Sequence, residues 1–138
     1  MVAGLVLYAV WFDIKADRYD ETAVPYLRAA IPELSSWRYE RLDPLLSAEA
    51  RLDFGNKKMR DAYRGFERLG ELVSMEKPQY LGHAPSANLV QNEIEIVDYQ
   101  VEVQFASGPA TIKLRLLADG ESYHIHHFGI YSEVFADE

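Results

Sequence analysis

Residues Glu93–Phe105 read EIEIVDYQVEVQF. From Val97 onward apolar and polar residues alternate, and successive side chains of a β-strand point to opposite faces of the sheet. The stretch therefore predicts a long strand with one buried face and one solvated face. Before Val97 the apolar residues, Ile94 and Ile96, occupy even positions, whereas from Val97 onward they occupy odd positions. A bulge or a sharp bend is therefore expected near Ile96–Val97.

Further strands are expected on both sides of this stretch. Residues 71–84, ELVSMEKPQYLGHA, indicate a strand that is interrupted near Pro78. After a short loop, ASGPA, the stretch TIKLRLLA (111–118) alternates again. Asp119-Gly120 then predicts a tight hairpin into the last strand, because this dipeptide suits two-residue turns.

The N-terminal half has helical periodicity instead. Over 18–37 the apolar positions that share one helical face are Val24, Leu27, Ile31 and Leu34, and Asp20 is a candidate cap. A short helix is expected from Ser47, and a longer one from the cap Asn56 to the natural stop at Gly70. Helices followed by strands with short turns predict an α+β fold. We expect the N-terminal helices to pack on one face of a bent antiparallel sheet of about four strands.

Composition limits the classes of function. The 138 residues are 49% hydrophobic and 26% charged, which is typical of one globular domain. The chain has no cysteine, which excludes disulfides, thiol catalysis and thiolate metal sites. Its net charge of −8 and the lack of a basic stripe disfavour nucleic acid as a partner.

The first residues form an uncharged apolar run, Val2–Phe12, that ends in Trp11 and Phe12 just before the first charges. As a helix it would span roughly 16 Å, about half of a bilayer core. It fits the outer part of a membrane anchor, a short interfacial or signal-like segment, or an apolar element packed on the domain. We favour the anchor, because aromatic residues suit a membrane–water boundary. The expected division is an apolar segment over 1–18 and a single domain over 19–138.

Three of the four histidines lie in the final predicted strand, which reads SYHIHHFGIYSEVF (122–135). In a regular strand His124 and His126 share one face and His127 lies on the other. A His-x-His pair can chelate a metal, but a site needs further ligands, and His83 is the only other histidine. The pair could instead supply a general base. We expect an ordinary packed strand with partly buried or edge histidines, and neither a metal site nor a cofactor.

Taken together, three stretches give the chain a resemblance to a known fold. They are YDETAVPYL (19–27), FERLGEL (66–72) and the closing hairpin DGESYHIHHFGIYSEVF (119–135). With the order of helices and strands, they resemble the ketosteroid-isomerase-like (nuclear-transport-factor-like, cystatin-like) cone, and more narrowly small bacterial envelope proteins of that fold. The resemblance implies a cone-like domain with a pocket, anchored on the periplasmic side of the cell envelope. It does not imply a particular chemistry, because this fold serves isomerases, dehydratases, cyclases and binding modules.

Our first functional hypothesis is a non-enzymatic envelope domain that binds a small apolar ligand or a protein partner, a second copy of the chain included. The alternatives are an isomerase or cyclase with a pocket histidine and tyrosine, and a metal-binding periplasmic module. No residue is assigned a catalytic role. The candidate ligand-binding residues are Trp37, Tyr63, Tyr99, His124 and His126.

Overall fold

The computed structural model describes residues 19–85, 94–119 and 122–137. The expected N-terminal anchor lies outside the described residues. The first described helix covers 19–34, and it is followed by α2 (Tyr39–Leu42), η1 (Asp43–Leu45), α3 (Ala48–Phe54), α4 (Lys57–Gly65) and η2 (Phe66–Leu69). The strands are β1 (Leu72–Met75), β2 (Gln79–Pro85), β3 (Ile94–Phe105), β4 (Gly108–Asp119) and β5 (Ser122–Tyr131), and η3 (Glu133–Asp137) closes the described chain.

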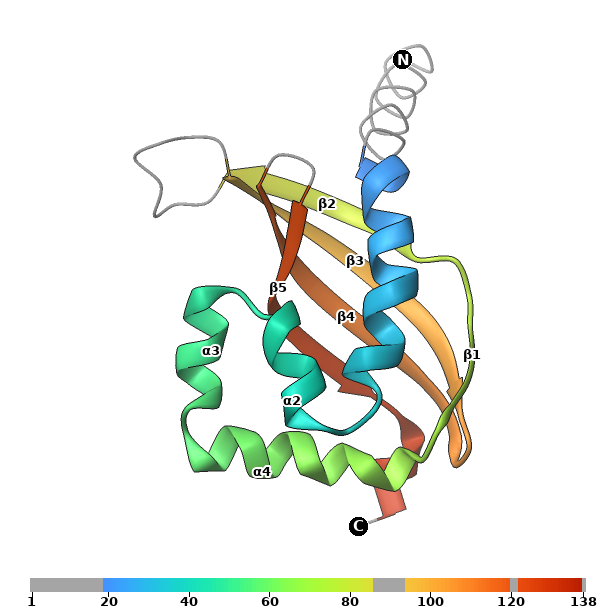
Figure 1. Ribbon diagram of the computed structural model, residues 1–138. Coiled ribbons are helices and arrows are strands. Elements are labelled where there is room, and N and C mark those ends of the chain that lie inside the picture. Colours follow the sequence, from blue (N-terminus) through green and yellow to red (C-terminus); the bar gives the residue numbers. More distant parts are fainter. Residues whose placement is uncertain (1–18, 86–93, 120–121, 138) are drawn as a thin grey trace.

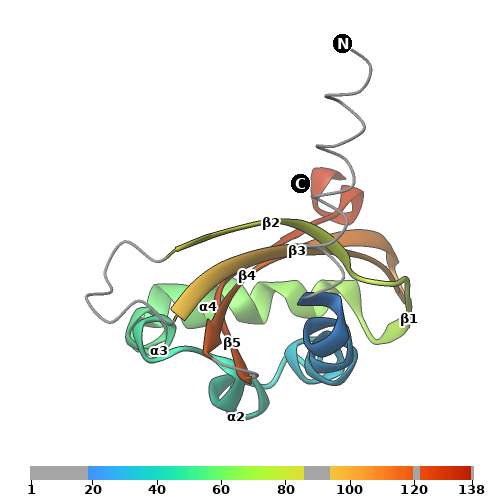
Figure 2. The same cartoon turned by 90° about the horizontal axis from the view of Figure 1, so that it is seen from above.

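The described strands form one antiparallel sheet with the order β1-β3-β4-β5, and β2 also pairs with β3. β1 and β2 share one edge of β3 and are separated around Pro78, where an interruption was expected. The expected four strands are therefore five, which occupy four positions across the sheet. Figures 1 and 2 show the α-helices gathered on one face of this twisted sheet, which confirms the α+β class.

The β3–β4 pair keeps one unbroken register from Ile94 opposite Asp119 to Phe105 opposite Gly108. The bulge that was one of the two features expected near Ile96–Val97 is thus absent from this pairing, and the prediction of a bulge was wrong. Ile96 lies on the outer face opposite Leu117, and both side chains are half-buried there. The shift of apolar residues from even to odd positions therefore reflects an apolar pair, Ile96 and Leu117, on the outer face. The pairing of β3 with β4 stays regular there. The register shifts in the described sheet lie in β1, β2 and β5.

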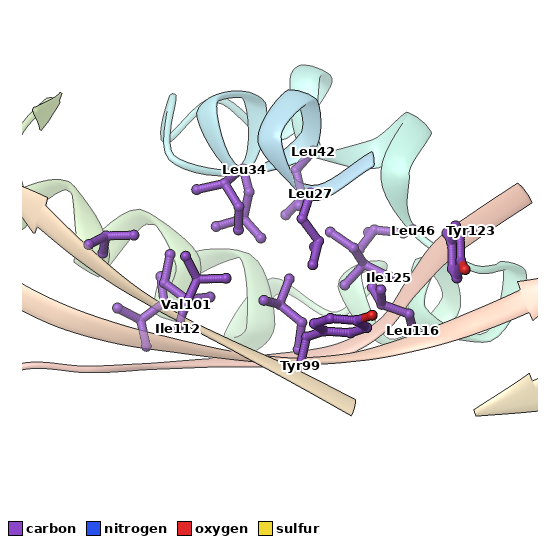
Figure 3. Close-up of a cluster of buried hydrophobic side chains, with 14 of the residues drawn as sticks. Leu27, Leu34, Leu42, Leu46, Tyr99, Val101, Ile112, Leu116, Tyr123 and Ile125 are labelled. Carbon is purple, nitrogen blue, oxygen red and sulfur yellow. The ribbon is translucent and has the colours of Figure 1, made fainter. Parts of the chain in front are cut away.

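The core lies between the inner face of the sheet and the helices, as Figure 3 shows. The alternating residues of β3 and β4 supply the floor, and every one of Val97, Tyr99, Val101, Ile112 and Leu116 is fully buried. The helical side is apolar as well, and its fully buried residues include Ala23, Leu27, Ile31, Leu34, Leu42, Leu46 and Leu69. The predicted helical face is confirmed at Leu27, Ile31 and Leu34, whereas Val24 is only half-buried and Ala23 packs in its place.

Two predicted helix boundaries are confirmed by hydrogen bonds or backbone geometry. The Asn56 side chain accepts from the backbone N–H of Lys58 at the start of α4. Gly70 ends η2 with φ of +80°, a left-handed conformation that glycine adopts without steric cost. A Cβ at this position would lie 3.0 Å from Cβ of Ala106, so the site is crowded as well.

Asp20 does not cap a helix, because residues 19 and 20 are already helical. Its carboxylate instead accepts a hydrogen bond of 2.7 Å from the hydroxyl of Tyr99, whose side chain is fully buried. Burial and the neighbouring Asp20 carboxylate raise the pKa of Tyr99 above its ordinary value. This bond joins the 19–34 helix to the centre of the sheet, and Tyr99 therefore has a structural partner.

We expect Tyr99→Phe to lower the free energy of unfolding by about 2 kcal/mol, because it removes a hydrogen bond to a charged group. Urea denaturation measures the loss. The matched control is Tyr26→Phe, since the buried Tyr26 hydroxyl has no hydrogen-bond partner within the described residues. The free energy of unfolding of Tyr26→Phe should lie within about 0.5 kcal/mol of the wild-type value or above it. Equal losses in the two variants would contradict the role given to the Tyr99–Asp20 bond.

Candidate functional site

A bulge in β5 decides where the histidines point. Across the β4–β5 pair, Arg115 lies opposite His127 but Leu116 lies opposite Ile125, so His126 is an extra residue. His124 and His127 both lie opposite outer-face residues, Leu117 and Arg115, and both are exposed. The expected pairing of His124 with His126 on one face is therefore wrong, because the inserted residue changes the parity of the strand.

His126 turns instead toward the start of α3. Leu46 forms a parallel bridge to Ile125, and the backbone N–H of Ser47 donates to the carbonyl of Ile125 at 2.9 Å. This contact places the Ser47 hydroxyl 3.1 Å from Nδ1 of His126. Nε2 of His126 lies 3.7 Å from the Glu49 carboxylate, and the imidazole is 25% exposed. His126 is thus a partly buried histidine at the sheet edge.

Ser47 has two structural functions. Its side-chain oxygen accepts from the backbone N–H of Ala50, so Ser47 caps α3, the short helix that was expected to start there. With that oxygen accepting from Ala50, the hydroxyl proton is free to be donated to Nδ1 of His126. The serine therefore joins α3 to the bulge of β5.

An apolar pocket of about 140 Å³ opens between α3, α4 and β5. Four aromatic rings border it, those of Phe54, Tyr63, Phe66 and Phe128. Its other lining residues are Leu46, Ala50, Asp53, Met59, Ala62, His126 and His127. Met59 is 38% exposed and Ala62 is exposed, so the pocket reaches the surface at α4. We call this site the apolar pocket.

The rings of the apolar pocket are held by one another. Phe54 stacks on Phe128 with centroids 6.1 Å apart, and the Tyr63 ring meets both edge-on, at 6.2 Å from Phe54 and 6.4 Å from Phe128. The Tyr63 hydroxyl donates to the carbonyl of Leu34 at 2.6 Å, and burial raises the pKa of Tyr63 to about 12. The Tyr63 ring therefore borders the pocket, while its hydroxyl proton is already donated to the backbone carbonyl of Leu34.

The five predicted site residues lie in different places. Tyr63 and His126 both border the apolar pocket. Trp37 packs against Tyr63, with centroids 5.9 Å apart, and borders a separate hollow. Tyr99 is bound to Asp20, and His124 is exposed on the outer face. The structure thus brings two of the five residues together around one pocket.

Sequence reasoning missed Phe54 and Phe128, which supply two of the pocket's four rings. Phe54 lies at the end of a short helix and was given no role, and Phe128 lies in a strand of mixed polarity, where an aromatic residue is typical of an ordinary packed strand. The available signal was the aromatic content of 54–66 followed by an aromatic residue in the last strand. That signal does not specify that the two segments meet, since the contact depends on the β5 bulge.

Comparisons of the chain with protein-family models, curated proteins and solved structures give no match. The resemblance to the ketosteroid-isomerase-like cone therefore stays a hypothesis beyond the α+β class. Within the described ranges, no group of three or more histidine, aspartate or glutamate side chains is placed to hold a metal ion. None of the described helices is both long and apolar enough to cross a membrane.

We expect Ser47→Ala to lower the free energy of unfolding by about 2 kcal/mol, because it removes both the cap of α3 and the partner of His126. The matched control is Asn56→Ala, which removes an exposed cap without a second partner and should cost about 1 kcal/mol or less. Both are measured by urea denaturation. A loss in Ser47→Ala no larger than that in the control would show that the serine–histidine bond adds no stability.

Proposed function

We propose that this domain is a non-enzymatic binding module and that the apolar pocket takes a small apolar ligand about the size of one aromatic ring. The observation that carries the proposal is a pocket of about 140 Å³ bordered by four aromatic rings. Apolar cavities of roughly 150 Å³ in proteins stay dry and bind benzene-sized molecules. Pockets for drug-sized ligands are larger, about 300–1,000 Å³, so the ligand class is small.

The polar groups at the pocket favour binding over catalysis. Acid–base chemistry needs a proton donor and a base that converge on the ligand. The Tyr63 hydroxyl already donates to the carbonyl of Leu34, and Nδ1 of His126 is already engaged by Ser47. The isomerase or cyclase alternative therefore lacks a free tyrosine donor among the residues that line this pocket.

The binding proposal predicts that indole or toluene perturbs the amide NMR signals of α3, α4 and β5 and raises the melting temperature with concentration. Ala62→Trp should abolish both effects, because the bulky ring fills the pocket from an exposed helical position. The matched control is Ala29→Trp, since Ala29 is also exposed on a helix and lines none of the described pockets.

Ala29→Trp should bind the probe as the wild type does. Binding that survives in Ala62→Trp, or no perturbation by either probe up to its solubility limit, would contradict a ligand in this pocket.

We also propose that the domain acts at the bacterial cell envelope, on the periplasmic side, held by the apolar run Val2–Phe12. The run's lack of charge and its terminal aromatic residues support this proposal. The chain expressed in a Gram-negative bacterium should sediment with membranes and be digested by protease added to spheroplasts. Val6→Asp combined with Leu7→Asp should release it, because charges in the run oppose insertion. Unchanged sedimentation of that variant would contradict the proposal.

A further inference from the structure

A second hollow, of about 280 Å³, lies between α2 and α4 and also borders Tyr63. Three arginines line it: Arg38 at the start of α2, and Arg60 and Arg64 on α4. Residues four apart lie on the same face of a helix, so the last two point to the same side of α4. We call this site the arginine hollow.

The charge of the arginine hollow is opposite to that of the protein. The chain carries a net charge of −8, yet three guanidinium groups and one carboxylate, that of Glu40, line this hollow. In the described part of the chain, none of the three arginines forms an ion pair with a carboxylate. Arg60 donates to the carbonyl of Gly55 at 3.3 Å, which leaves the rest of its guanidinium available. The site therefore has a local excess of positive charge.

The aromatic wall of the hollow is fixed in place. Trp37 has φ of +60°, a left-handed conformation that is sterically unfavourable for a residue with a Cβ atom. It is held there because its indole N–H donates to the carbonyl of Gly70 at 2.9 Å and its ring packs on Tyr63. Tyr39 is held by a bond of 3.1 Å from its hydroxyl to Asp43. These rings are half-buried, so their remaining surface is presented in a constant orientation.

We infer that the arginine hollow is a binding site for a small organic anion that carries a carboxylate or phosphate group on an aromatic ring. The planar fork of a guanidinium matches the geometry of both oxyanions and can bind them through two parallel hydrogen bonds. Trp37 and Tyr39 also border the hollow. The Trp37 ring packs on Phe66 and Phe105 and the Tyr39 ring stacks on Phe54, so the aromatic part of the ligand would contact the remaining half-buried surface of the two rings. The inference does not rest on the proposed function, because it concerns other residues and an anionic ligand.

Titration with phenyl phosphate, benzoate, benzamide and inorganic phosphate, followed by NMR, tests this inference. The reporters are the indole N–H of Trp37 and the Nε–H signals of Arg60 and Arg64. Phenyl phosphate and benzoate should shift these signals, and added salt should weaken the binding, because exposed charges are screened. Benzamide is uncharged and should not bind. Inorganic phosphate should bind more weakly than phenyl phosphate, since it lacks the ring.

Three variants separate the roles of the charges. Arg60→Gln and Arg64→Gln should each weaken the binding of phenyl phosphate about tenfold or more, because losing one hydrogen bond between charged groups lowers an affinity by about that factor. Glu40→Gln should tighten it, because it removes the one carboxylate that lines the hollow. The control is Arg28→Gln, an exposed arginine on the 19–34 helix that borders none of the described pockets, and it should bind as the wild type does.

Since the substituted residues are exposed, each variant should retain the wild-type melting temperature. Failure of phenyl phosphate and benzoate to shift the reporters at about 10 mM, in the millimolar range of the weakest ligands, would overturn the inference. Affinities that are unchanged in both Arg60→Gln and Arg64→Gln would also overturn it. Inorganic phosphate that binds as tightly as phenyl phosphate would overturn the aromatic part of the ligand class.

Discussion

The structure depends on the unbroken pairing of β3 with β4. Each strand has 12 residues, and their common register places one face of both in the core, from Val97 to Phe105 in β3 and from Ala110 to Ala118 in β4. Two paired strands are marginally stable in water unless such a face is covered. The 19–34 helix and α2 cover it, and their leucines meet Val101, Ile112 and Leu116 in Figure 3. The Tyr99–Asp20 hydrogen bond adds a polar connection at the centre of this interface.

A second constraint on the structure is that the last strand must contact both its neighbour in the sheet and the short helices. β5 has to pair with β4 and also contact the segment that starts α3, where Leu46 and Ser47 bond to Ile125. The extra residue at His126 provides a side chain for that second contact. As a result, α3 and α4 stand beside Phe128 and leave the apolar pocket between them. The bulge thus has a direct consequence for the candidate site.

Tyr63 lies between the two candidate binding sites, which differ in polarity. Its ring borders the apolar pocket, whose lining is mostly aromatic and aliphatic, and it borders the arginine hollow, whose lining is cationic. Its hydroxyl is bound to the backbone of Leu34, so neither site receives a free phenol from it. The helix α4 supplies residues to both sites because its polar and apolar side chains occupy different faces.

The sequence by itself determined the α+β class, the alternation of β3 and β4, the interruption near Pro78, the start of a short helix at Ser47 and the cap at Asn56. All of these follow from local periodicity or from contacts within a few residues of the chain. The tertiary structure alone decided the direction of the histidines, the partner of Asp20 and the lining of both sites. His126 and Ser47 are 79 positions apart, as are Tyr99 and Asp20. Contacts of that kind depend on register and on bulges, and a single inserted residue reverses which face a side chain occupies.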